Sequence, residues 1–204
     1  QASANVELSA ERVEQGGIVG VAITGMVGET APTVETDLGS VQCTRSPSGW
    51  RAYIPAAYNA SAGAHDVTLT VNGEVLTKTL TVLPKDFGTA EMEAEPAPTE
   101  AANTEFRNSI WPLYEQPAQE KLWSGGFVCP AEDYLVLLDF GQIKITNGQQ
   151  GSKSNSTKLY TIPGDPARAP ANGTVAFAGN LALTGSTVVI DHGCGMRSYL
   201  YGLQ

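Results

Sequence analysis

The 204-residue sequence is poor in histidine, cysteine and basic residues, and each shortage excludes a class of site. It has 2 histidines and 3 cysteines and no Cys-x-x-Cys pair, so a zinc site built on thiolates is not expected. It has 12 Lys and Arg against 21 Asp and Glu, a net charge of −9. This balance argues against nucleic acid as a partner, because phosphate binding needs clustered basic side chains. No apolar run reaches the roughly 18 residues that a membrane-spanning helix requires.

Short β-strands are expected over residues 1–84. The clearest pattern is HDVTLTV-NG-EVLTKTLTVL, in which apolar residues alternate up to Asn72-Gly73 and alternate again on the return. Asn-Gly accepts positive φ at both turn positions, so this stretch predicts a hairpin. Strands at this spacing, within about 85 residues, predict an immunoglobulin-like β-sandwich for residues 1–84.

Residues 85–117 differ in composition from the residues before them. The stretch DFGTAEMEAEPAPTEAANTEF carries six acidic residues and no Lys or Arg, which predicts an acidic linker. Its later part, from Thr99 to Tyr114, has an apolar face through Ala102, Phe106, Ile110 and Leu113. This spacing predicts a short helix that docks onto a neighbouring domain.

Residues 118–204 predict a second β domain, without a helix long enough for a βαβ unit. DYLVLLDFG is expected to be a buried strand and ITNGQQGSKSNST a loop. STVVIDHGCGMRSYLYG predicts two strands joined at Gly193–Gly195. The fold class expected from the whole chain is therefore mainly all-β, with two modules and one connecting helix.

The order of short motifs in residues 123–204 carries a family resemblance. The motifs are Phe140-Gly141, Asn147-Gly148, Gly164-Asp165-Pro166, Ala169-Pro170, Gly173-Thr174-Val175, Ile190-Asp191-His192-Gly193 and Leu200-Tyr201-Gly202. This order resembles the lysostaphin-type (LytM-like) zinc endopeptidases, which cut peptidoglycan cross-bridges. The resemblance implies an antiparallel β domain of the duplicated hybrid motif type. The sequence reaches Gln204 before the family's last strands and their His-x-His, so residues 118–204 are expected to be a C-terminally truncated, incomplete domain of this type. The resemblance also implies an immunoglobulin-like module, which commonly precedes the domain.

The residues that carry the chemistry in that family are replaced here. The resemblance places the two zinc ligands, His and Asp, at Asn155 and Leu159, and a catalytic His at Leu203. Leucine has no donor atom and asparagine is a poor zinc ligand. His65 and His192 lie in different predicted domains, and the chain has no His-x-His. No zinc or other cofactor is therefore expected, and the domain is interpreted as degenerate.

Other side chains with chemical potential have competing interpretations. Asp191, His192 and Cys194 are close in sequence, but successive strand side chains point to opposite faces, so a capped turn histidine is expected instead of a metal site. Cys129 and Cys194 could form a disulfide, or all three cysteines could be small buried apolar residues. The residues proposed to line a groove are Asn155, Tyr160, Asp191, His192, Tyr199 and Tyr201.

The function expected from the resemblance is that of a bacterial cell-envelope protein, extracellular after removal of a signal peptide or anchor. Residues 118–204 would act as a non-catalytic peptidoglycan-binding, scaffold or regulatory module. One alternative is an active zinc endopeptidase whose missing ligands come from beyond Gln204 or from a partner. Another is a surface adhesin or spacer that uses the immunoglobulin-like domain. An unpaired C-terminal strand would also favour self-association.

Overall fold

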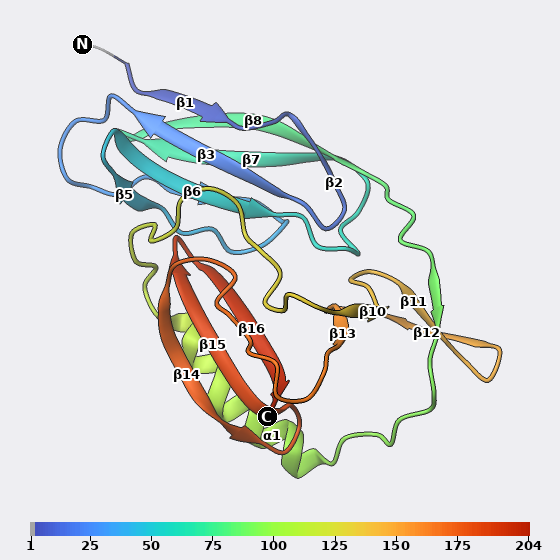
Figure 1. Cartoon of the computed structure of the whole chain (residues 1–204). Helices are drawn as coiled ribbons and strands as arrows, with labels where there is room; N and C mark the ends of the chain where they lie inside the picture. Colours follow the sequence, from blue (N-terminus) through green and yellow to red (C-terminus); the bar gives the residue numbers. More distant parts are fainter. Residues whose placement is uncertain (1–2) are drawn as a thin grey trace. The chain divides into compact units, whose positions relative to one another are not determined.

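The structure is a computed structural model that describes residues 3–204. These residues form mainly antiparallel β-sheets, with one α-helix among them (Figure 1). The expected fold class is therefore confirmed. The chain divides into two compact units. Unit 1 runs up to Asp86 and includes Pro117–Lys121, and unit 2 consists of Phe87–Gln116 and Leu122–Gln204. Within residues 3–204, no helix has both the length and the apolar character needed to cross a membrane.

Unit 1 contains two four-stranded sheets. The first has the order β1-β3-β6-β5, with bounds Asn5–Leu8, Ile18–Thr24, Gly49–Pro55 and Thr44–Ser46. The second has the order β2-β8-β7-β4, with bounds Arg12–Glu14, Glu74–Leu83, Gly63–Val71 and Thr33–Glu35. β2 runs parallel to β8, and the other neighbours in both sheets are antiparallel. The two sheets form a β-sandwich around a shared core.

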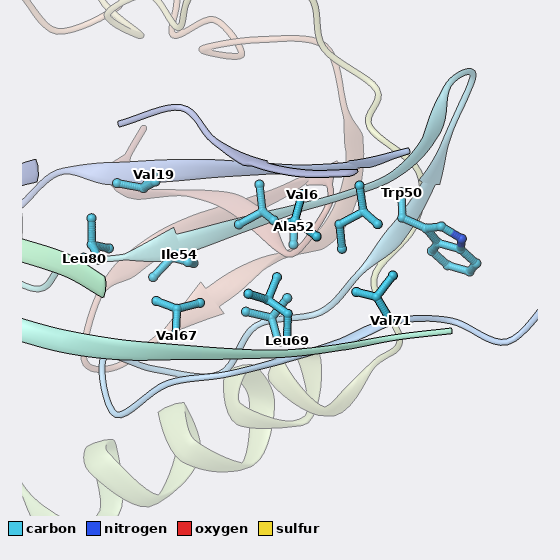
Figure 2. Packing of buried hydrophobic residues seen from close by; sticks show 12 residues of the cluster. Val6, Val19, Trp50, Ala52, Ile54, Val67, Leu69, Val71 and Leu80 are labelled. Atoms are coloured by element: carbon cyan, nitrogen blue, oxygen red, sulfur yellow. The ribbon is translucent and has the colours of Figure 1, made fainter. Parts of the chain in front are cut away.

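Apolar side chains at alternate positions along the strands of unit 1 fill that core. Val67, Leu69 and Val71 of β7 are buried, and Figure 2 shows them pointing toward Ala52 and Ile54 of the facing sheet. Side chains two apart on a strand share one face of the sheet, so β-strand spacing in the sequence produces this layer directly. Each fully buried Val, Leu or Ile contributes about 1.5–3 kcal/mol relative to an exposed one.

The Asn72-Gly73 turn forms the predicted β7–β8 hairpin. Val71 pairs with Glu74, and the two turn residues have φ of 52° and 78°. Asn147-Gly148 makes the same two-residue turn, with φ of 51° and 73°. It joins two strands where a loop was expected, so the loop prediction for residues 145–157 is wrong in its first half. The physical reason is that Asn-Gly favours the primed turn that matches strand twist, whatever the polarity of the residues after it.

Unit 2 contains three small sheets. The longest strands form β14-β15-β16, with bounds Thr174–Leu181, Gly185–Gly193 and Met196–Leu203. A second sheet is β12-β11-β9, with bounds Gln149–Lys153, Ile143–Thr146 and Thr89–Glu91. The third is the pair β10-β13, Leu135–Leu138 and Lys158–Tyr160. β9 comes from the segment expected to be a linker and pairs in parallel with β11.

The predicted helix is confirmed as α1 (Glu100–Ile110), followed by the 3₁₀ turn η1 (Trp111–Glu115). The Thr99 hydroxyl caps it by accepting a hydrogen bond from the Ala102 N–H at 3.1 Å. Its apolar face packs on the β14-β15-β16 sheet through a small cluster of buried residues, Ile110, Leu113, Leu181 and Val189. The acidic segment thus supplies the helix that covers the main sheet of unit 2.

The strand in DYLVLLDFG forms as β10, but the expectation that it is buried is wrong. Leu135 is 66% exposed, Val136 50% and Leu137 48%, and Leu138 is the buried member of the strand. β10 belongs to a two-stranded ribbon, and none of its residues is part of the buried cluster under the main sheet of unit 2. An apolar run in a sequence is compatible with a buried strand, but burial depends on whether other elements pack against that strand.

Candidate functional site

The β15–β16 hairpin carries the IDHG motif at its closed end. Gly193 pairs with Met196, so Cys194 and Gly195 form a two-residue turn with φ of 55° and 73°. Cys194 takes the first position, which Asn occupies in the other two primed turns of the chain. The two strands and the turn at Gly193–Gly195 confirm the sequence prediction for this stretch.

His192 is fully buried, at 0% exposure, and both ring nitrogens have partners. Nδ1 lies 2.8 Å from the Asn172 carbonyl oxygen, and Nε2 lies 2.7 Å from the Ser198 hydroxyl. The Phe127 ring meets the imidazole edge to face, with centroids 4.8 Å apart. A neutral ring satisfies both contacts, because Nδ1–H can donate to the carbonyl while the hydroxyl donates to Nε2. The His192 ring therefore connects the loop at Asn172 to Ser198 on β16.

Asp191 is also buried, and its side chain is used locally. Its carboxylate accepts a hydrogen bond from the Gly193 N–H at 2.9 Å, which stabilises the start of the turn. As neighbours on one strand, Asp191 and His192 extend from opposite faces of the sheet. Asp191, His192 and Cys194 are therefore all buried at the end of the hairpin.

The positions that the resemblance assigns to zinc ligands carry no ligand set. Asn155 is exposed between β12 and β13, and Leu159 lies on β13 opposite Val136. Leu203 lies on β16 opposite Ser186. The Asn155 amide and the Leu159 hydrocarbon side chain do not fit zinc, which takes imidazole, thiolate or carboxylate ligands. Leu203, at the place of the catalytic histidine, has no group that could transfer a proton. Across residues 3–204, no three His, Cys, Asp or Glu side chains are grouped so that they could hold a metal ion.

The tyrosines expected to line a groove have different surroundings. Tyr199 and Tyr201 form an aromatic chain with α1 and η1: ring centroids are 6.3 Å apart for Tyr114–Tyr199, 6.4 Å for Tyr199–Tyr201 and 6.2 Å for Phe106–Tyr201. Burial is the main cause that raises the pKa of the Tyr199 phenol, and the neighbouring Tyr114 raises it further. Tyr160 instead lies exposed on β13. The structure therefore brings Tyr199 and Tyr201 together, and buries Asp191 and His192.

The cysteines do not form the disulfide considered from the sequence. Among the described residues, Cys129 and Cys194 are not bridged, with Cys129 partly buried and Cys194 buried. Burial raises the pKa of the Cys43 thiol to about 11. At neutral pH this thiol stays protonated and is a poor nucleophile. Cys194 is buried as the alternative interpretation expects, whereas Cys43 and Cys129 are only partly buried.

Sequence reasoning missed the surroundings of the other histidine, His65 in unit 1. The structure places its ring nitrogens against the Asp37 carboxylate and the Ser61 carbonyl oxygen. Asp37 is 28 residues away in the chain. No local motif marks such a contact, because it depends on how two loops of the sandwich meet.

Comparison with known proteins supports the fold. No protein-family profile matches the chain, and no curated protein matches its sequence. Among solved structures, the chain is similar to a Pseudomonas aeruginosa protein provisionally assigned as an M23 peptidase. The TM-score is 0.59 at 19% identity, over 93% of this chain and 73% of that one. The described residues therefore have a mainly β fold like that of this protein, which agrees with the fold expected from the lysostaphin-type resemblance.

Proposed function

We propose that this protein is a bacterial cell-envelope protein whose unit 2 is a degenerate lysostaphin-type domain. In this proposal the domain binds peptidoglycan, or scaffolds or regulates enzymes that process it, and does not hydrolyse it. Unit 1 would be an immunoglobulin-like module that precedes it. The protein would act outside the cytoplasm.

The observation that carries the proposal is the combination of an M23-like fold with unsuitable residues at the ligand positions. The likeness to the Pseudomonas protein spans both units of the chain. Asn155, Leu159 and Leu203 stand where the resembling enzymes have two ligands and a catalytic histidine. A hydrolase needs about three protein ligands and an open position for water on the metal. Loss of these residues with the fold retained favours binding over cleavage.

The β-sandwich of unit 1 supports the immunoglobulin-like part of the proposal. Its two antiparallel-dominated sheets share one apolar core, as sandwich modules of about 85 residues do. The chain crosses between the sheets five times, at β1–β2, β2–β3, β3–β4, β4–β5 and β6–β7. Such crossings are typical of Greek-key sandwiches.

The first experiment measures zinc binding and hydrolysis together. We expect no stoichiometric zinc binding in isothermal titration calorimetry and no release of soluble muropeptides from purified peptidoglycan. We also expect the protein to co-sediment with insoluble peptidoglycan. Tight 1:1 zinc binding together with muropeptide release would overturn the non-catalytic assignment, and absence of co-sedimentation would overturn the binding role.

A second experiment tests the assignment of the ligand positions themselves. The double variant Asn155→His/Leu159→Asp restores the His-x-x-x-Asp pair, and we expect it to gain weak zinc binding. The matched control Ser156→His/Tyr160→Asp introduces the same residues one position later. Equal zinc binding by both variants would contradict the assignment of residues 155 and 159.

We also propose weak self-association through the C-terminal strand. β16 lies at the edge of the β14-β15-β16 sheet. An edge strand presents unpaired backbone groups that can pair with another chain. Light scattering over a concentration series should show dimers that Leu203→Lys weakens and Gln204→Lys does not. A monomer at all concentrations would contradict this part of the proposal.

A further inference from the structure

His65 of unit 1 sits where two connections between the sheets meet. The β4–β5 connection carries Asp37 from the second sheet to the first, and the β6–β7 connection carries Ser61 back again. His65 is the third residue of β7, and its side chain is 8% exposed. Its imidazole contacts both connections, one through each ring nitrogen.

Both partners of the ring are acceptors. Nδ1 lies 2.8 Å from Oδ1 of Asp37, and Nε2 lies 2.6 Å from the carbonyl oxygen of Ser61. An ionised carboxylate and a peptide carbonyl have no hydrogen to donate. A neutral imidazole has one N–H, so it would leave one of these oxygens facing a nitrogen lone pair. Only the imidazolium, with two N–H groups, satisfies both contacts.

The charged groups around the ring also favour the imidazolium. His65 and Asp37 line an open hollow of about 480 Å³ together with Glu35 and Asp66, and its lining contains three carboxylates and no Lys or Arg. On the other side of β7, β8 places Leu80 opposite His65. The hydrogen bond to the Ser61 carbonyl is the largest cause that raises the pKa of His65, and the hydrogen bond to Asp37 is the second. Burial lowers this pKa and so opposes the rise.

We propose that His65 is a pH-dependent clasp, which as an imidazolium joins the β4–β5 and β6–β7 connections and on deprotonation releases one of them. The exposed partner, Asp37, is the one that leaves, because its side chain is 73% exposed and water can replace the contact. The Ser61 carbonyl keeps the remaining N–H. The acidic hollow lined by Glu35 and Asp37 therefore changes shape and charge when the clasp opens.

The sign of the pH effect follows from the direction of the pKa. A histidine whose pKa is raised by folding contributes stability that is fully present below its unfolded pKa of about 6.5. That contribution is lost as the pH rises through the folded pKa. The β4–β5 connection is therefore held in mildly acidic solution and loosened in alkaline solution.

The test is an NMR titration of the full-length chain, in which the 2 histidines give separable imidazole signals. We expect His65 to titrate above 6.5 and amide exchange in residues 36–40 to quicken as it deprotonates. In Asp37→Asn the amide can donate to a neutral ring, so the His65 pKa should fall and the exchange step should disappear. Asp66→Asn removes an equal charge from the same hollow but leaves both ring contacts, so the exchange step should remain.

Two results would overturn the clasp. One is a His65 that titrates at or below 6.5 in the unsubstituted protein. The other is an equal effect of Asp37→Asn and Asp66→Asn on the His65 pKa and on amide exchange, which would show general electrostatics without a specific contact. Neither result bears on peptidoglycan binding, which is measured separately.

Discussion

Units 1 and 2 bury very different amounts of apolar side chain. In the described residues, the core cluster of unit 1 (Figure 2) contains twelve buried residues from both sheets. The main cluster of unit 2 contains four. Both units expose some large apolar side chains, and those of unit 2 include Leu135, Ile162 and Val175. Exposed apolar surface of this kind often marks a binding face.

The smaller apolar cluster of unit 2 is accompanied by buried polar contacts at the end of the β15–β16 hairpin. His192 and Asp191 connect the turn, the sheet and the Asn172 loop through three hydrogen bonds. A buried polar group that loses its partner costs about 1–3 kcal/mol. Substitutions in each unit can therefore test how much apolar burial and buried hydrogen bonds contribute to its stability.

The largest expected effect comes from Leu69→Ala in the core of unit 1. Leu69 is 0% exposed, and removing its side chain leaves a cavity, so we expect a loss of about 2–5 kcal/mol. The matched change Leu135→Ala removes the same atoms from a side chain that is 66% exposed and should cost less than about 0.5 kcal/mol. Urea unfolding, with hydrogen exchange to assign each unit, measures both. Similar losses would mean that β10 is covered in solution.

The next effect is expected from Gly173→Ala in unit 2. A Cβ at this position would lie 2.6 Å from the Asp191 carbonyl oxygen and 2.9 Å from Nδ1 of His192. Backbone must move to relieve this overlap, so we expect a loss of about 1–3 kcal/mol and a weakened His192–Asn172 contact. Gly126→Ala meets nothing within 4 Å and serves as the control. Equal thermal stability of the two variants would show that the His192 anchor is not tightly packed.

A smaller effect is expected from removing the cap of α1. Thr99→Ala leaves the Ala102 N–H without its side-chain acceptor, at a cost of about 1 kcal/mol. Thr99→Ser keeps the hydroxyl and should be close to the unsubstituted protein. Hydrogen exchange across Glu100–Ile110 separates the two variants. If neither variant changes exchange, the helix is held by Ile110 and its apolar neighbours alone.

The smallest effect on stability is expected from Leu135→Lys. The side chain is already largely in water, so the free energy of unfolding should change by less than about 0.5 kcal/mol. Binding of a hydrophobic dye to the folded protein should nevertheless fall, because a charge interrupts the apolar strand. Lys78→Leu, on β8 of unit 1, is the converse control and should raise it. Unchanged dye binding in Leu135→Lys would place the exposed apolar surface elsewhere.

Much of the local structure was predictable from the sequence. The Asn72-Gly73 hairpin, the α1 helix with its Thr99 cap, and the turn after His192 each depend on residues within a few positions of one another. Backbone geometry at such places follows from side-chain chemistry, whatever the distant packing. The same reasoning would have found the Asn147-Gly148 hairpin had the turn been weighted above the polarity of the residues that follow.

Burial and long-range pairing were decided only by the tertiary structure. The sequence by itself determined the helix, the Asn72-Gly73 hairpin and the two strands around the turn after His192. It did not determine that Leu135 would be exposed, nor that His65 would meet Asp37 and Ser61. Those outcomes depend on which elements lie across from one another, and contacts between distant segments arise from packing that no local pattern encodes.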